Sequence, residues 1–347
     1  MKVLLVKLSS LGDVVHTLPV VQDILSAHPG AQIDWVVEKS FAPLLSPLVG
    51  AGLHRVIPCE LRRWRKSPLA AATRAEWKIF KSLLQAEHYD AVIDLQGLTK
   101  SALVARLASV TATGKRYALA NQTDGSGYEA PTRWVADVAI FIEPHIHAMQ
   151  RSRVLSARAL GYSLPPAWSY GLNPALAQSP RTKFAIKTVA FVHGTSRANK
   201  QWPEEDWVAL GRRLAALGFQ IALPHGSDEE LASCERMAAA INLGSEGRPT
   251  TQAVIWPRLS LDALTQQLAQ CAGVIGVDSG VSHIAVALDL PHVQIYNFDT
   301  AWRTGPLPGT AGGHQVSVYA QPAPTVQAVW DAWMSCAPTD AQAQSVV

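Results

Sequence analysis

Apolar and polar positions follow one another in blocks that match short buried strands, each followed by an amphipathic helix. The first block, Val3 to Val6, is a continuous apolar run, which is typical of a strand buried on both faces. A polar loop with Gly12 at its bend follows, and a helical pattern then runs from about Asp13 to Ala27. Pro19 falls in the first turns of that pattern, where proline is tolerated better than in mid-helix. Further strands are predicted at 33–37, 55–58 and 91–95, and further helices at 73–87, 100–108 and 149–160.

The alternation restarts in the second half of the chain. Strands are predicted there at 188–192, 219–223, 253–256, 274–277 and 293–296, and helices at 204–217, 228–241, 261–271 and 326–334. Residues 119–147 are rich in Gly and polar residues and are weakly patterned, and the Pro-rich stretch 161–181 is predicted to link two domains. We therefore expect an α/β fold of two doubly wound, Rossmann-like domains at 1–165 and 166–325, with a final helix and a frayed tail at 326–347.

Composition excludes several classes of protein. The 347 residues are 48% hydrophobic and 16% charged, so the chain can bury sizeable cores. A net charge of only +3 does not favour nucleic-acid binding. The four cysteines, widely spaced and without a CxxC pair, imply neither disulfides nor a zinc site. Lys7 interrupts the first apolar run too early for a signal peptide, and no run reaches the length of a membrane span, so we expect a protein that is soluble or lies on a membrane surface.

The stretch from Val274 to Leu290 combines a strand, a turn of small residues and a helix start, which is the architecture of a phosphate site. Gly280 would let a ligand approach the backbone closely, and the first free amides of the helix would face that ligand. Asp278 and Ser279 are also good N-cap residues, so a purely structural interpretation stays open. No GxGxxG motif follows the first strand of either half, so a dinucleotide site is unsupported.

Three other groups in the second half fit a nucleotide ligand. In the loop 192–203, Thr195 and Ser196 could donate hydrogen bonds to a diphosphate and Lys200 could supply a charge, although an ordinary polar loop would look the same. Glu230 could bind a ribose or could simply favour the first turn of its helix. His283 could reach a phosphate, or its ring could be satisfied locally.

The first half carries a carboxylate and a basic cluster. Asp13 is either a helix N-cap or a base that takes a proton from a hydroxyl, with Lys7 and Lys100 able to tune it in either direction. The cluster at 62–66 is either a solvated surface or a site for an anionic ligand, in which Trp64 could rest on a sugar or a lipid headgroup layer. The two halves together have the layout of a nucleotide-sugar transferase.

Seven segments in order resemble the lipopolysaccharide heptosyltransferase family, glycosyltransferase family 9, and are closest to its heptosyltransferase I branch. They are KLSSLGDVVHTLP, IDWVVE, VIPCELRRWRK, YDAVIDLQGLTKSAL, HGTSRANKQWPEEDW, LPHGS and VDSGVSHIAVALDLP. The resemblance implies a GT-B enzyme that transfers L-glycero-D-manno-heptose, with inversion, from ADP-heptose to the first Kdo (3-deoxy-D-manno-octulosonic acid) of Kdo2-lipid A. It also implies no obligatory metal or cofactor and a peripheral location on the cytoplasmic face of the inner membrane. A monomer is the favoured state, and nucleic acid is not an expected partner.

Carried across motif by motif, the resemblance makes Asp13 the general base. Its donor residues would be Thr195, Ser196, Lys200, Glu230, Asp278, Ser279, Gly280 and His283. Its acceptor residues would be Arg62, Arg63, Arg65, Lys66, Gln96 and Lys100. The loop 296–304 departs from the familiar pattern, and Ser279 stands where threonine is more usual. A heptosyltransferase II-like enzyme, a nucleotide-sugar epimerase and a non-catalytic binding protein remain alternatives.

Overall fold

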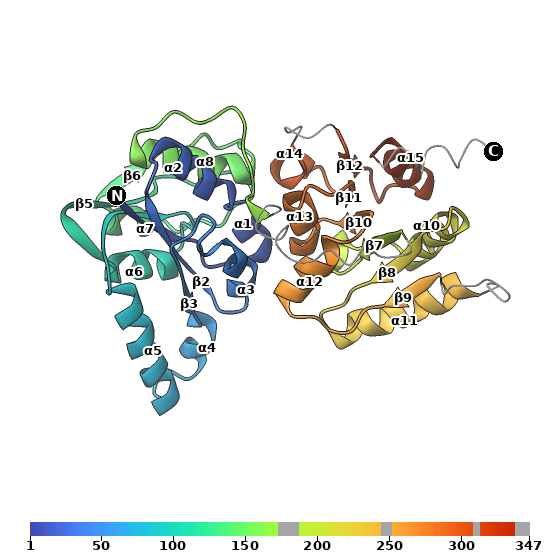
Figure 1. Ribbon diagram of the computed structural model, residues 1–347, viewed down its shortest axis with the longest axis horizontal. Helices are drawn as coiled ribbons and strands as arrows, with labels where there is room; N and C mark the ends of the chain where they lie inside the picture. The colour runs from blue at the N-terminus through green and yellow to red at the C-terminus, as the bar shows by residue number, and fades with distance from the viewer. Residues whose placement is uncertain (173–186, 244–251, 308–312, 337–347) are drawn as a thin grey trace. The chain divides into compact units, whose positions relative to one another are not determined.

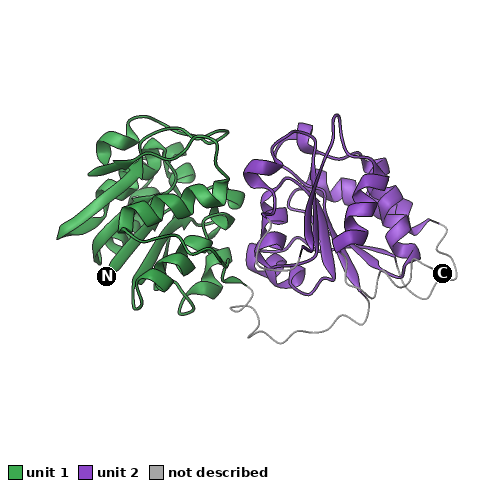
Figure 2. Cartoon of the chain, turned by 90° about the horizontal axis from the view of Figure 1, so that it is seen from above, with its two compact units in different colours: residues 1–175 green, residues 176–347 purple. Residues whose placement is uncertain are grey.

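The computed structural model describes residues 1–172, 187–243, 252–307 and 313–336. The chain forms two compact units, Met1–Ala175 and Leu176–Val347 (Figure 2). Each unit is built on a six-stranded sheet in which every described strand pair is parallel. The predicted α/β class with two Rossmann-like sheets is therefore confirmed. Much of the predicted link at 161–181 and the tail beyond residue 336 lie outside the described residues.

The first sheet has the order β3-β2-β1-β4-β5-β6 (Figure 1). Its strands are β1 (Lys2–Val6), β2 (Gln32–Glu38), β3 (Arg55–Cys59), β4 (His88–Asp94), β5 (Ser109–Leu119) and β6 (Val138–Ile140). The connecting helices are α1 (Leu11–Val15), α2 (Pro19–Ala27), α3 (Ala42–Leu45), η1 (Ser46–Leu48), α4 (Leu61–Lys66), α5 (Ala71–Leu84), α6 (Thr99–Leu107), α7 (Thr132–Val135) and α8 (Ala148–Leu160).

The second sheet has the order β12-β11-β10-β7-β8-β9. Its strands are β7 (Thr188–Val192), β8 (Gln220–Leu223), β9 (Ala253–Ile255), β10 (Gly273–Val277), β11 (His292–Tyr296) and β12 (Gln315–Tyr319). The helices are η2 (Ala198–Lys200), α10 (Glu204–Ala216), α11 (Asp228–Asn242), α12 (Leu261–Leu268), α13 (Gly280–Ala287), α14 (Ala301–Thr304) and α15 (Val326–Cys336).

The strand order reverses once in each sheet. In the first unit the chain leaves β1 toward β2 on one side and returns to β4 on the other, and in the second unit β7 and β10 hold the same positions. In open parallel sheets, ligands bind beyond the carboxyl ends of the strands at such reversals. The loops after β1, β4, β7 and β10 are therefore the expected places for a functional site.

The single helix predicted from Asp13 to Ala27 is wrong. The structure has two helices there, because Pro19 has no N–H to bond the preceding turn and instead begins α2. The strands β5 and β12 were not predicted because they lack a continuous apolar run, and β6 was not predicted because the strand is only three residues long and lies in a weakly patterned stretch. The basic cluster at 62–66 forms the short helix α4.

An internal ion pair fixes helix α8 against helix α2. Arg153 donates to Asp23 through Nε at 2.6 Å and through Nη2 at 3.0 Å, and both side chains are only 2% exposed. Such a two-point, fully buried pair sets the rotation of α8 about its axis. The orientation matters because α8 also carries Arg151, two residues earlier, to the loop after β1.

Candidate active site

The loop after β1 gathers one carboxylate and two cations. Lys7 is 1% exposed; its Nζ donates to the Leu95 carbonyl at 3.0 Å and lies 3.5 Å from Oδ1 of Asp13. Nη2 of Arg151 lies at 3.5 Å from the same oxygen. The other oxygen, Oδ2, accepts hydrogen bonds from the backbone N–H and the hydroxyl of Ser10 at 3.1 and 2.9 Å. The N-cap of α1 is Ser10 rather than Asp13, and the Asp13 side chain remains 35% exposed.

The charges around Asp13 decide its protonation state. Burial raises the pKa of the carboxyl, but Lys7, Arg151 and the bonds from Ser10 outweigh burial and lower the pKa to about 2. Burial lowers the pKa of Lys7 to about 8, against the opposing effect of Asp13. Lys7 thus tunes Asp13 in one direction only: it keeps the carboxylate ionised and makes it a weaker base than an isolated one.

The loop after β4 forms hydrogen bonds to the loop after β1, which leads to Asp13. Gln96 accepts hydrogen bonds from the backbone N–H groups of Leu8 and Ser9 through Oε1, both at 3.1 Å. Nζ of Lys100 donates to the Ser9 hydroxyl at 3.2 Å. The structure therefore brings Gln96 and Lys100 to the Asp13 loop. The Gln96 carbonyl oxygen is used internally, and only its amide N–H groups remain for a ligand.

Asp94 organises the loop after β4 from beneath. Its Oδ1 accepts from the backbone N–H groups of Gln96 and Gly97 at 2.9 and 3.2 Å, and its Oδ2 accepts from the Ser101 hydroxyl at 3.0 Å. Asp94 is 1% exposed, and burial raises its pKa to about 6 against these bonds. Asp94 is thus a support for Gln96 rather than a group that faces a ligand.

Helix α4 divides the predicted acceptor residues into two kinds. All four basic residues of the helix are exposed, but Arg62, Arg65 and Lys66 have no ion pair in the described part of the chain. Arg63 instead donates to Glu60 at 2.6 Å and also pairs with Glu76 of α5. The prediction that Trp64 contacts a sugar or a headgroup layer as an open platform is wrong, because its side chain is only 7% exposed and its Nε1–H donates to Glu76 at 2.7 Å.

The loops after β7 and β10 meet at Asp278, which is 6% exposed. Lys200 forms an ion pair with its Oδ2. On the other oxygen, Nε2 of His283 lies at 3.4 Å and the Thr304 hydroxyl at 3.5 Å. Burial raises the pKa of Asp278, but the bonds and charges from His283 and Lys200 reverse that effect and hold the pKa well below its usual range. Asp278 therefore fixes the position of Lys200.

Other predicted donor residues surround this ion pair. The Thr195 hydroxyl donates to the Asp278 carbonyl at 3.4 Å, and Ser196 is exposed in the same loop. Ser279 is the N-cap of α13 and accepts from the Ser282 N–H at 3.4 Å, as the structural interpretation required. His283 is 5% exposed, and its Nδ1 lies 3.5 Å from Nε2 of Gln294, so both ring nitrogens face protein groups.

Glu230 of α11 lies between the loops after β7 and β8. Its Oε2 accepts from the backbone N–H of Gly226 at 2.6 Å, after β8. A Cβ atom placed on Gly194 would lie 2.3 Å from Oε1 of Glu230, so only glycine leaves room for the carboxylate there. Glu230 is thus held against the loop that carries Thr195.

The loop after β11 is the segment whose sequence departs from the familiar family pattern. The structure adds two residues from it: Thr304, beside Asp278, and Asn297, whose Nδ2 donates to the carbonyls of Gln201 and Asn199 at 2.8 and 3.3 Å. Arg151 was also missed. The loop's position after the strand next to β10 was the available signal, whereas no local pattern marked Arg151.

Residues 77–330 match the model of glycosyltransferase family 9 (heptosyltransferase). The chain belongs to this family. The heptosyltransferase is 40% identical over 319 residues to lipopolysaccharide heptosyltransferase 1 of Escherichia coli (strain K12), over 90% of this chain and 91% of that relative. It is similar in structure to the E. coli heptosyltransferase WaaC with ADP, with a TM-score of 0.83 and 35% identity over 97% of this chain and 100% of that one.

A second WaaC structure, with ADP-2-deoxy-2-fluoro heptose, matches with a TM-score of 0.78 and 36% identity, over 95% of this heptosyltransferase and 98% of that chain. These comparisons confirm the expected family and the GT-B fold, and the chain is a glycosyltransferase.

Proposed function

We propose that this heptosyltransferase moves L-glycero-D-manno-heptose from ADP-heptose to the first Kdo of Kdo2-lipid A in lipopolysaccharide inner-core synthesis. The 40% identical relative and the two similar WaaC structures with ADP ligands support this reaction. The observation that carries it is the pair of polar clusters at the two strand-order reversals. One holds an open carboxylate, Asp13, and the other holds a fixed cation, Lys200.

On the donor side, Lys200 stabilises the charge that builds on the leaving diphosphate. A lysine has three N–H donors, and Asp278 takes one, so the others remain for phosphate oxygens. Thr195, Ser196 and the amides that begin α13 around Gly280 add hydrogen bonds. Glu230 binds the ribose, and His283 acts through Asp278 as a positioning residue.

On the acceptor side, Asp13 takes the proton of a Kdo hydroxyl as its oxygen attacks the anomeric carbon and ADP leaves. Lys7 and Arg151 keep Asp13 ionised before the reaction and remain beside it when it is protonated. Arg62, Arg65, Lys66 and Lys100 meet the carboxylates and phosphates of the acceptor. Arg63 supports α4 through its carboxylate partners.

Neutralising Arg62, Arg65 and Lys66 together with glutamine is expected to raise the acceptor KM by roughly tenfold or more, because each lost charge-assisted bond costs about 1 kcal/mol or more. The Kd for ADP should stay unchanged. The single change Arg63→Gln is the matched comparison. It should lower Tm, because Arg63 is paired with Glu60 and Glu76, and should leave the acceptor KM close to that of the wild type. Equal losses of acceptor and ADP binding in the triple variant would point to misfolding instead.

Lys7→Met is expected to move the acid limb of the pH–rate profile to higher pH. The folded-state pKa of Asp13 is about 2 and is held down by Lys7, so removing the cation raises that pKa. The ionised base is present only above its pKa, so activity at low pH is lost first. The pKa of the Asp13 carboxyl group, followed by NMR from pH 2 to 8 in both proteins, tests this, and an unchanged pKa would show that Lys7 does not set the state of Asp13.

Gly194→Ala is expected to weaken ADP binding by roughly tenfold with little change in Tm. The new methyl group would displace the Glu230 carboxylate, which is the flexible end of a side chain, and break its bond to Gly226. Calorimetric titration with ADP measures the loss, and Glu230→Gln should match it. Wild-type affinity for ADP in both variants would show that Glu230 does not bind the ribose.

The reaction itself is tested by ADP release from ADP-heptose with and without Kdo2-lipid A. Release that requires the acceptor supports the transferase, whereas a new nucleotide sugar without acceptor would indicate an epimerase, and binding without turnover would indicate a non-catalytic protein. An acceptor that already carries one heptose distinguishes the heptosyltransferase II alternative.

The protein is proposed to work on the cytoplasmic face of the inner membrane as a peripheral protein. No helix among residues 1–172, 187–243, 252–307 and 313–336 is long and apolar enough to cross a bilayer.

A further inference from the structure

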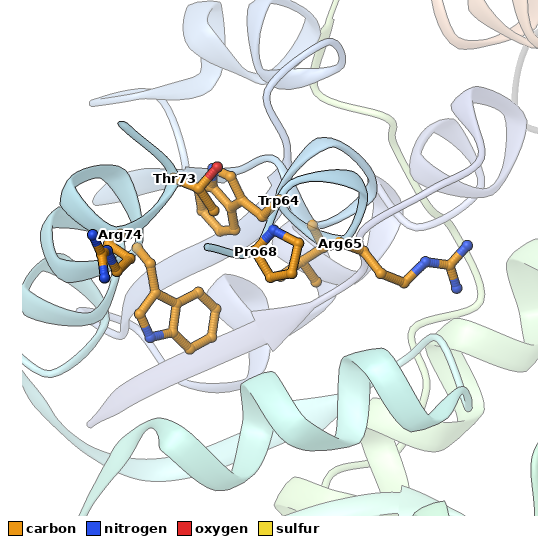
Figure 3. A pocket seen from close by; sticks show the side chains of 7 residues that line it. Trp64, Arg65, Pro68, Thr73 and Arg74 are labelled. Carbon is orange, nitrogen blue, oxygen red and sulfur yellow. The ribbon is translucent and has the colours of Figure 1, made fainter. Parts of the chain in front are cut away.

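Helices α4 and α5 enclose an apolar pocket. The pocket has a volume of about 350 Å³, in the range of roughly 300–1,000 Å³ that is typical of ligand pockets. Its walls are Leu61, Trp64, Pro68, Thr73 and Trp77, together with the stems of Arg65 and Arg74 (Figure 3). The Trp64 indole has its N–H bonded to Glu76, so its ring offers carbon atoms to the pocket.

The two helices that form this pocket carry a strong positive charge. Residues 61–81 contain seven Lys or Arg side chains and one carboxylate, Glu76, which gives a formal charge of +6, whereas the whole chain has +3. On α5 the spacing of Arg74, Lys78 and Lys81 places them in one stripe beside Trp77. Of the cations on these two helices, Arg63 alone is paired with carboxylates within the described part of the chain.

The connection between the two helices is also apolar at its tip. Leu69 is 83% exposed, more than any other large hydrophobic side chain among the described residues. It directly follows Pro68, which lines the pocket. The features of this hairpin match the two parts of an anionic lipid. Its apolar tip and pocket suit the acyl chains, and its unpaired cations suit the negatively charged headgroup. Long Lys and Arg side chains can place their stems against acyl chains while their charges stay at the headgroups.

We propose that the α4–α5 hairpin, residues 61–84, docks on an anionic bilayer and takes one lipid acyl chain into the pocket. The proposal rests on the proposed association with a membrane surface and names its segment and its lipid class. Each Lys or Arg near an anionic surface adds favourable binding energy, and the pocket adds apolar burial. A nucleic acid would satisfy the charges but would leave the pocket without an apolar occupant.

The test is co-sedimentation of the full chain with vesicles of phosphatidylcholine and phosphatidylglycerol at 3:1, compared with phosphatidylcholine alone. We expect salt-sensitive binding to the anionic vesicles only. The double variant Arg74→Glu/Lys78→Glu should weaken it by at least about 30-fold, and Leu69→Asp should weaken it by about tenfold. The matched controls are Arg106→Glu/Lys115→Glu and Leu103→Asp, which alter exposed residues elsewhere in the same unit.

Vesicles with brominated acyl chains test the pocket itself. They should quench tryptophan emission more strongly in the wild type than in Trp77→Phe, with vesicle binding retained. Binding to neutral vesicles at equal strength, equal losses in the control variants, equal quenching in Trp77→Phe, or a change of oligomeric state in place of lipid binding would each overturn the proposal. Activity on a deacylated, water-soluble Kdo2 acceptor is measured in parallel, so that failure of membrane docking is distinguished from failure of the transferase.

Discussion

Replacing Asp13 with asparagine is expected to lower kcat by roughly 10²–10⁴-fold, which is the usual contribution of a general base. The amide cannot take the proton of the attacking hydroxyl, but its oxygen can still accept the bonds from Ser10. The affinity for ADP should be unchanged, since the residues proposed to bind the donor lie in the second unit. Turnover close to that of the wild type would exclude Asp13 as the base.

The control for Asp13→Asn is Ser10→Ala, which removes one hydrogen bond to Oδ2 and keeps the carboxylate. It should lose less than about tenfold in kcat, because a single neutral hydrogen bond contributes about 1 kcal/mol. Thermal unfolding of both variants is needed as well. Asp13→Asn leaves Lys7 and Arg151 close together without their shared anion, so its Tm should fall.

Replacing Lys200 with alanine is expected to lower kcat/KM for ADP-heptose by roughly 10²–10³-fold, the range seen when one group that stabilises transition-state charge is removed. The same change leaves the carboxylate of Asp278 buried and repelling the diphosphate, so the Kd for ADP should rise too. Steady-state rates and ADP titration together measure both effects. Unchanged ADP affinity would place the diphosphate elsewhere.

The double variant Lys200→Ala/Asp278→Asn separates ligand binding from folding. Removing Lys200 alone strands a buried charge, which lowers stability, whereas removing both charges leaves a neutral pair of side chains. We therefore expect the double variant to recover most of the lost Tm but only the small part of the lost kcat/KM that comes from repulsion by the Asp278 carboxylate. Full recovery of activity along with stability would mean that Lys200 has only a structural role.

Most of the sheet architecture could be predicted from the sequence, because strands buried on both faces are written as short continuous apolar runs. β1, β7 and β10 are of this kind. β5 and β12 are not, because many of their side chains are partly exposed and give no such run. The break at Pro19 was missed because the apolar spacing continues across it, although the backbone cannot.

The site could be predicted in part. Asp278 directly follows β10, and Asp13 lies in α1, the first helix after β1, so topology places both at the carboxyl ends of their strands. Arg151 comes from the middle of a distant helix, and its approach to Asp13 depends on the Arg153–Asp23 pair that orients α8. Trp64 was interpreted as exposed because it lies within a basic run of the sequence. Its side chain instead packs against Trp77 and Phe80.

We infer that the first unit carries the proton chemistry and the second unit holds the nucleotide. The most direct measurement is calorimetric titration of ADP into Asp13→Asn and Lys200→Ala, made side by side with the wild type. We expect wild-type affinity for Asp13→Asn and a loss of roughly tenfold or more for Lys200→Ala, because the latter loses a charge-assisted bond. Loss of ADP affinity in Asp13→Asn, with Lys200→Ala binding normally, would contradict this inference.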